Sequence, residues 1–136
     1  MLLINRICID TLKARDQMSN WEALTSENGK FNAKVSLGGE LIVRMIQGSP
    51  EWRTNVELDI DNGPYTLRMK NDNELVVLTN DSNIKWRSNT RIFHPLSKMG
   101  YVKMENNGKL TIYRGDGKPI WKSGTNEGTI RIFYEN

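Results

Sequence analysis

The sequence has a single cysteine, Cys8, and a single histidine, His94, among its 136 residues. One cysteine excludes an intrachain disulfide, and a histidine with no second histidine or cysteine cluster gives no metal-ligand spacing. No apolar run approaches the ~20 residues of a membrane-spanning helix. The short apolar start has neither a signal-peptide core nor a cleavage site. We therefore expect a cytoplasmic protein without a membrane span, a metal or another cofactor.

Sequence signatures of catalysis are also missing. The chain has no nucleophile elbow, no phosphate-binding P-loop and no glycine-rich dinucleotide turn. Asp59 with Asp61, and Asp72 with Glu74, form carboxylate pairs, but nothing in the pattern predicts the burial that would shift their pKa values. The sequence therefore predicts a protein that is not an enzyme.

Charge of one sign is not concentrated anywhere in the chain. The net charge is +3, from 19 Lys and Arg against 16 Asp and Glu. The basic residues mostly alternate with apolar ones, which is typical of solvated strand faces and not of a basic tail. The charge pattern therefore gives little support to a nucleic-acid partner.

One stretch of sequence occurs three times. Each copy has an aligned leucine within a short, mostly apolar strand, and a tryptophan follows that leucine by eleven residues. The copies are offset by 34 and then 35 residues, which indicates one supersecondary unit used three times. We expect a single domain over residues 1–136, with repeats around 29–55, 63–89 and 99–124. The leucine and tryptophan pairs are Leu41 and Trp52, Leu75 and Trp86, and Leu110 and Trp121.

Each repeat has the pattern of a β-hairpin. Apolar and polar residues alternate on both sides of a turn such as Asn71-Asp72-Asn73 or Asn106-Asn107-Gly108. Helical periodicity is nearly absent, since the one candidate, residues 10–17, lacks an apolar stripe. We predict an all-β protein of about a dozen short strands, with further strands at residues 2–9, 21–24 and 129–134.

The three repeated tryptophans have two possible roles. One tryptophan occurs at the same position in each repeat. This favours an arrangement in which the three rings converge on a shared axis, where they would bury a large apolar area. The alternative is three exposed aromatic platforms on which sugars or bases could stack. The sequence favours the core, because large aromatic residues are mostly buried.

The returning strand of the hairpin resembles a known family motif. Residues 69–78 and 104–113, each followed by Trp-Arg-Ser or Trp-Lys-Ser, fall in the frame Q-x-D-x-N-x-V-x-Y of the bulb-type, monocot mannose-binding lectins. The resemblance implies a β-prism II fold, with three antiparallel four-stranded sheets around a pseudo-threefold axis. It also implies a possible homodimer in which the last strand, Thr129 to Tyr134, is exchanged between subunits.

The resemblance also implies candidate carbohydrate-binding residues on the second and third copies. Only Asp72, Val76 and Tyr113 match the motif fully, and the first copy matches it nowhere. We therefore predict a lectin for mannose or related glycans, or glycoproteins bearing them, with at most two working sites. The candidates are Lys70, Asp72, Glu74, Val76, Glu105, Asn107, Lys109 and Tyr113.

The substitutions in the motif leave a second interpretation open. Gln and Asn both donate and accept hydrogen bonds, whereas Lys only donates and ionised Glu only accepts. The same residues could be an ordinary outer strand face with cross-strand ion pairs. In that case the lectin fold would have lost sugar binding and would serve protein–protein interaction.

Overall fold

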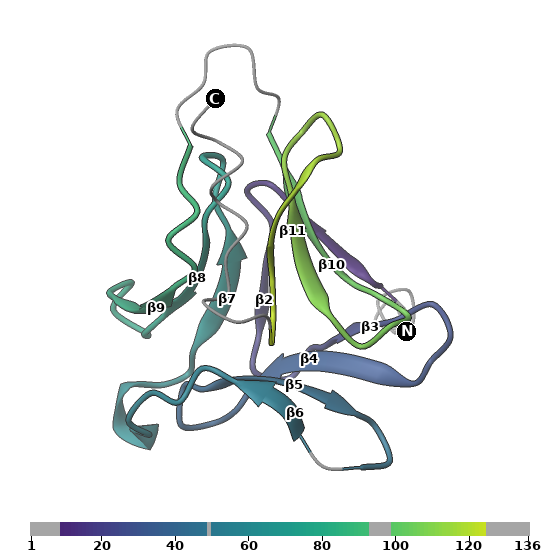
Figure 1. Cartoon of the computed structure of the whole chain (residues 1–136). Coiled ribbons are helices and arrows are strands. Elements are labelled where there is room, and N and C mark those ends of the chain that lie inside the picture. Colours follow the sequence, from purple (N-terminus) through teal and green to yellow (C-terminus); the bar gives the residue numbers. More distant parts are fainter. Residues whose placement is uncertain (1–8, 49, 93–98, 125–136) are drawn as a thin grey trace, which may run out of the picture.

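The computed structural model describes residues 9–48, 50–92 and 99–124 (Figure 1). These residues form short strands and one 3-10 turn, η2 (Ile60–Asn62). The predicted strand at 129–134 and nearly all of that at 2–9 lie outside the described residues, as do Cys8 and His94. The strands are β1 (Thr11–Lys13), β2 (Gln17–Ser19), β3 (Leu24–Thr25), β4 (Phe31–Val35), β5 (Leu41–Met45), β6 (Pro50–Arg53), β7 (Thr66–Met69), β8 (Leu75–Leu78), β9 (Ile84–Arg87), β10 (Tyr101–Met104), β11 (Leu110–Tyr113) and β12 (Pro119–Lys122).

The strands form three four-stranded antiparallel sheets, which confirms the predicted all-β fold. We number the sheets by the repeat they contain. The first sheet has the order β3-β4-β5-β6, the second β2-β7-β8-β9 and the third β1-β10-β11-β12. Figure 1 shows them as three walls around a common centre. In the described part of the chain, no helix has the length and apolar character needed to cross a membrane.

The N-terminal segment contributes one strand to each sheet. β1 pairs with β10, β2 with β7 and β3 with β4. Three successive strands then complete each sheet as a local antiparallel meander. Segments far apart in the sequence are therefore joined in two of the three sheets.

The hairpin turns have the same backbone geometry in the three sheets. The residue two positions before the returning strand has a positive φ in each case, at Gly39 (93°), Asn73 (74°) and Gly108 (89°). Glycine and asparagine tolerate this left-handed conformation better than other residues. Each returning strand also carries an irregularity at the equivalent step, between residues 43 and 44, 77 and 78, and 112 and 113.

The three repeated tryptophans meet at the centre of the molecule, as predicted. Their ring centroids lie 5.5–6.0 Å apart and their planes cross at 63–76°, so each pair packs edge to face. Each ring comes from the last strand of a different sheet, and all three belong to the core or pack against it. The rings of Trp52, Trp86 and Trp121 therefore bind the three sheets together.

A hydroxyl two residues after each tryptophan fixes the returning strand. The side-chain oxygens of Thr54, Ser88 and Ser123 accept the backbone N–H of the aligned leucine at 3.2, 3.0 and 2.9 Å. The backbone N–H of the same residue donates to that leucine's carbonyl. This explains why the Trp-x-Ser/Thr spacing recurs.

The fourth tryptophan differs from the others. The predicted strand over residues 21–24 is wrong in its bounds, because β3 covers only Leu24–Thr25. Trp21 lies before it in a turn, where Glu22 N–H donates to Ser19 O at 3.1 Å, and is 74% exposed.

Candidate carbohydrate-binding faces

The motif residues lie on the outward faces of the sheets. On β8, Leu75 and Val77 point into the core, and Val76 points outward between Arg68 of β7 and Arg87 of β9. Val76 is nevertheless fully buried. It therefore forms the floor of the second face, beneath longer side chains.

Charged side chains in the second repeat are joined in a network of ion pairs. Lys70 Nζ lies 3.6 Å from Asp72 Oδ2 and 3.5 Å from Glu74 Oε1. The other oxygen of Glu74 lies 3.9 Å from Arg87 Nε, and the Glu74 side chain is only 2% exposed. A buried carboxylate needs such partners. The groups that would bind a sugar here therefore already bind one another.

The first repeat contains a similar pair. Glu40 is buried, and its Oε1 lies 3.2 Å from Arg53 Nη1. Its Oε2 accepts the Asn55 N–H at 3.0 Å. Two of the three copies therefore replace the asparagine of the motif with a glutamate, which an arginine directly after the tryptophan holds in place.

The third repeat departs from this arrangement. Lysines stand at both equivalent positions, Lys109 and Lys122. Asn107 Oδ1 accepts the backbone N–H of Lys109 at 2.9 Å, which shapes the turn. The Lys109 ammonium makes no ion pair within the described residues. This face therefore has a hydrogen-bond donor that an external acceptor can use.

Tyr113 and Glu105 form the ordered part of the third face. The Tyr113 hydroxyl donates to Glu105 Oε2, and Thr111 Oγ1 donates to Glu105 Oε1 at 3.3 Å. The ring of Tyr113 stacks on Tyr101, with centroids 5.1 Å apart and planes 22° apart. Burial and the hydrogen bond to Glu105 raise the pKa of Tyr113 to about 12. The phenol is therefore neutral at physiological pH and is held in one orientation.

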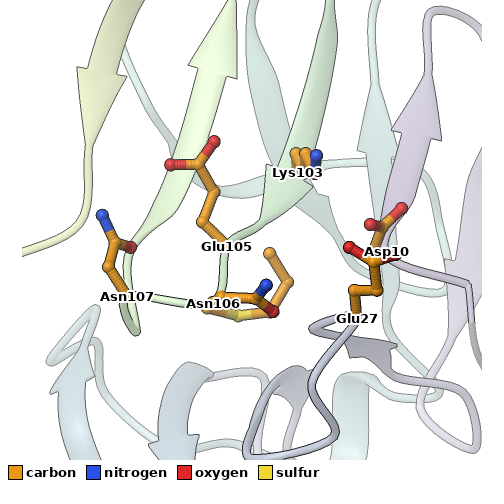
Figure 2. Close-up of a pocket in the computed structure, with 7 residues that line it drawn as sticks. Asp10, Glu27, Lys103, Glu105, Asn106 and Asn107 are labelled. Atoms are coloured by element: carbon orange, nitrogen blue, oxygen red, sulfur yellow. The ribbon is translucent and has the colours of Figure 1, made fainter.

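A cavity of about 310 Å³ lies beside Glu105 (Figure 2). Glu105 and Asn107 lie on one side, with Asp10 and Glu27 on the other. Its lining carries more carboxylates than cations, since Lys103 is its one basic residue. This charge disfavours an anion and suits a neutral ligand with several hydroxyl groups.

The structure thus brings the predicted residues together as two separate groups. Lys70, Asp72 and Glu74 form the charged second face over Val76, and the third group contains Glu105, Asn107, Lys109 and Tyr113.

Arg87, Asp10 and Glu27 were not predicted. Arg87 directly follows a repeated tryptophan, so its position could have been found from the repeat. Nothing local in the sequence brings Asp10 and Glu27 to Glu105. Among the described residues, no group of three His, Cys, Asp or Glu side chains could hold a metal ion.

By sequence, no protein-family model and no curated protein matches the chain. By structure, the chain is similar to solved lectins. A lectin from Marasmius oreades aligns over 86% of this chain and 92% of its own, with a TM-score of 0.73 and 20% identity. A monomeric monocot mannose-binding lectin from Gastrodia elata covers 86% and 98%, with a TM-score of 0.70 and 23% identity.

The mannose-specific agglutinin of snowdrop (Galanthus nivalis) bulbs, solved with methyl-α-D-mannoside, covers 86% and 97%. Its TM-score is 0.66 and its identity 23%. The chain has the β-prism II fold. These identities are too low for the likeness to show more than the fold, so the ligand of this β-prism must be argued from its own side chains.

Proposed function

We propose that this protein is a lectin that binds mannose or a related neutral glycan on the outward faces of its third and second sheets. The observation that carries the proposal is the Glu105–Tyr113 pair, fixed beside a cavity on a β-prism II fold. Solved proteins with this fold include mannose-binding lectins. The first sheet, which keeps none of the motif, is not part of this proposal.

The third face offers the groups that a sugar requires. Neighbouring sugar hydroxyls both donate and accept, so a site needs acceptors and donors close together. Glu105 supplies carboxylate oxygens, Lys109 supplies an ammonium donor and Asn107 an amide. The stacked ring of Tyr113 gives this polar face a rigid edge, which reduces the entropy lost on binding.

The second face is the weaker of the two sites in this proposal. A sugar there must compete with the contacts of Lys70 to Asp72 and Glu74. Each face is shallow, so strong attachment to a branched glycan would come from engaging two faces at once. A homodimer formed by exchange of residues 129–134 would add further faces. That dimer, the cytoplasmic location and the assignment of residues 1–136 to one domain stay predictions.

The test is a titration of the ¹⁵N-labelled protein with methyl-α-D-mannoside and with mannose oligosaccharides, followed residue by residue by NMR. We expect the largest shifts around Glu105, Lys109 and Tyr113. Tyr113→Phe should weaken binding because it removes the hydroxyl. Tyr101→Phe is the matched control, since it keeps the stacked pair. If no NMR signal from the second or the third face shifts at high sugar concentration, the proposal is rejected.

One observation favours a second candidate function. The ion pairs of the buried Glu40 with Arg53 and of the buried Glu74 with Arg87 occupy two of the three faces. A β-prism whose faces are closed in this way could serve protein–protein interaction. Captured protein partners that excess mannose does not displace, together with a flat sugar titration, would support this function over the first.

A further inference from the structure

A second cavity, of about 480 Å³, lies on the first sheet. Its walls come from the turn after β2 and from the outward residues of β4 and β5. This volume is in the range of small-molecule sites. The residues used below are Trp21, Asn32, Lys34, Ile42 and Arg44.

Trp21 supplies a flat aromatic wall to this cavity. Its side chain is 74% exposed, although a buried indole would stabilise the fold far more. The neighbouring residue holds it in place, because the buried Asn20 donates from Nδ2 to Val35 O at 3.0 Å and Ser36 O at 2.9 Å. Asn20 Oδ1 also accepts the Tyr65 N–H at 2.8 Å. The exposed ring therefore projects from a fixed backbone.

Two cations lie on the strands that face this ring. Asn32 is directly opposite Arg44 and Lys34 is directly opposite Ile42, so Lys34 and Arg44 are diagonal neighbours. Diagonal neighbours on one sheet face are about 7–8 Å apart, close enough for long side chains to reach one anion.

Neither cation has a counter-ion within the described residues. Arg44 has one weak hydrogen bond there, from Nη2 to Gly48 O at 3.5 Å. The carboxylate of Glu40, on the same sheet, is already held by Arg53 and the Asn55 N–H. The cavity is therefore electropositive, in contrast to the acidic cavity beside Glu105.

Asn32 adds an unsatisfied acceptor between the two cations. Its Oδ1 atom is buried and has no hydrogen-bond partner among the described residues. An unpaired buried carbonyl oxygen is costly. Because Asn32 lines the cavity, a turn of its side chain toward a ligand hydroxyl would satisfy this oxygen. The cavity thus combines an aromatic wall, an acceptor for a hydroxyl and two donors for an anion.

We infer that this cavity is a binding site for an anionic saccharide, a sugar that carries a carboxylate or a sulfate. The apolar face of the sugar ring would lie on Trp21, a hydroxyl would donate to Asn32 Oδ1, and the anionic group would lie between Lys34 and Arg44. This site does not depend on mannose binding by the second and third sheets.

Single-stranded nucleic acid is the competing ligand, because bases also stack on aromatic rings. Such binding needs a positive groove that follows the backbone over several nucleotides. Among the residues that line this cavity, only Lys34 and Arg44 carry positive charge, and the cavity beside Glu105 is lined mainly by carboxylates. The local charge therefore favours one small anion.

The test uses the full chain, labelled with ¹⁵N and titrated with glucuronic acid and galactose 6-sulfate. Glucose and galactose are the neutral controls, and a short oligothymidylate is the competitor. We expect the indole N–H of Trp21 and the side-chain amide of Asn32 to shift with an acidic sugar, and the effect to weaken with salt. A response to only one acidic sugar would identify its carboxylate or its sulfate as the anion recognised.

Two variants decide whether the named residues form the site. Lys34→Gln with Arg44→Gln, and separately Trp21→Ala, should each weaken acidic-sugar binding by about tenfold or more. Arg68→Gln is the matched control, since Arg68 occupies the position of Lys34 on the second sheet and pairs with Gln17 Oε1 at 2.9 Å. Mannose binding on the third sheet should not change in any of them.

Equal binding of neutral and acidic sugars, full binding by both variants, or tighter binding of the oligothymidylate would each overturn the inference. If the protein binds acidic sugars but does not bind mannose, only the proposed function is rejected.

Discussion

Tyr113 donates its phenolic hydrogen to Glu105, and the two side chains join the returning strand β11 to the end of β10. The same carboxylate accepts a hydrogen bond from Thr111. Two side-chain hydrogen bonds on the third face therefore depend on one acceptor, the Glu105 carboxylate.

This pair predicts a pH dependence. The pKa of Tyr113 is about 12 in the folded protein, against 10.0 for a free tyrosine, because burial and Glu105 disfavour the phenolate. A raised pKa means that the stabilising contribution is complete below pH 10 and is lost as the pH rises through about 12. NMR titration of ¹³C-labelled tyrosine should show this late transition. Glu105→Gln should lower the pKa of Tyr113, and an unchanged value would contradict the assignment.

The central rings predict a large difference between two tryptophans. Trp121→Ala should reduce the free energy of unfolding by about 3–5 kcal/mol, because it removes a buried ring from the contact of the three sheets. Trp21→Ala should change it by no more than about 0.5 kcal/mol, because that ring is largely exposed. Denaturant unfolding of both variants measures the difference. Similar losses would mean that Trp21 also supports the fold.

Two glycines with similar backbone angles predict unequal costs. Gly39 has a φ of 93°, and a Cβ atom there would lie 2.7 Å from Tyr65 Cζ. Gly117 has a φ of 91° and nothing within 4 Å of such an atom. Gly117→Ala should cost about 1–2 kcal/mol of stability, the price of the left-handed backbone alone. Gly39→Ala should cost about 1–3 kcal/mol more through overpacking. Denaturant unfolding of the two variants measures these costs. If both substitutions lower the denaturant midpoint equally, the Tyr65 ring moves aside to make room for the added methyl group.

The two lysines of the third repeat predict a stabilising substitution. Lys109→Glu puts a carboxylate where Glu40 and Glu74 meet an arginine in the other repeats. Pairing with Lys122 should raise the free energy of unfolding by about 0.5–1 kcal/mol at low salt. The gain should shrink in high salt and in a Lys122→Met background. A gain that survives both conditions would have another origin.

Much of the fold could be predicted from the sequence, because the repeat itself determines the main contacts. Alternation identified the inward residues of the hairpins, and the constant leucine-to-tryptophan spacing predicted the meeting of Trp52, Trp86 and Trp121. Both features depend on local period, which the sequence displays directly.

The properties of the faces could not be predicted in the same way. Alternation places Glu74 outside the core, but its burial depends on Lys70 and Arg87, which cover it. Likewise, the exposure of Trp21 depends on hydrogen bonds from Asn20 to the far end of β4. Whether an outward side chain is covered depends on residues of neighbouring strands, and the sequence pattern along one strand does not show this.

The distribution of β1, β2 and β3 over three sheets has a consequence for synthesis on the ribosome. The partner of β3 follows it at once, but the partner of β1 lies near the end of the described chain. Such distant pairing slows folding. The nascent chain would therefore carry the unpaired edge of β1 until β10 emerges, and the third sheet could form only then.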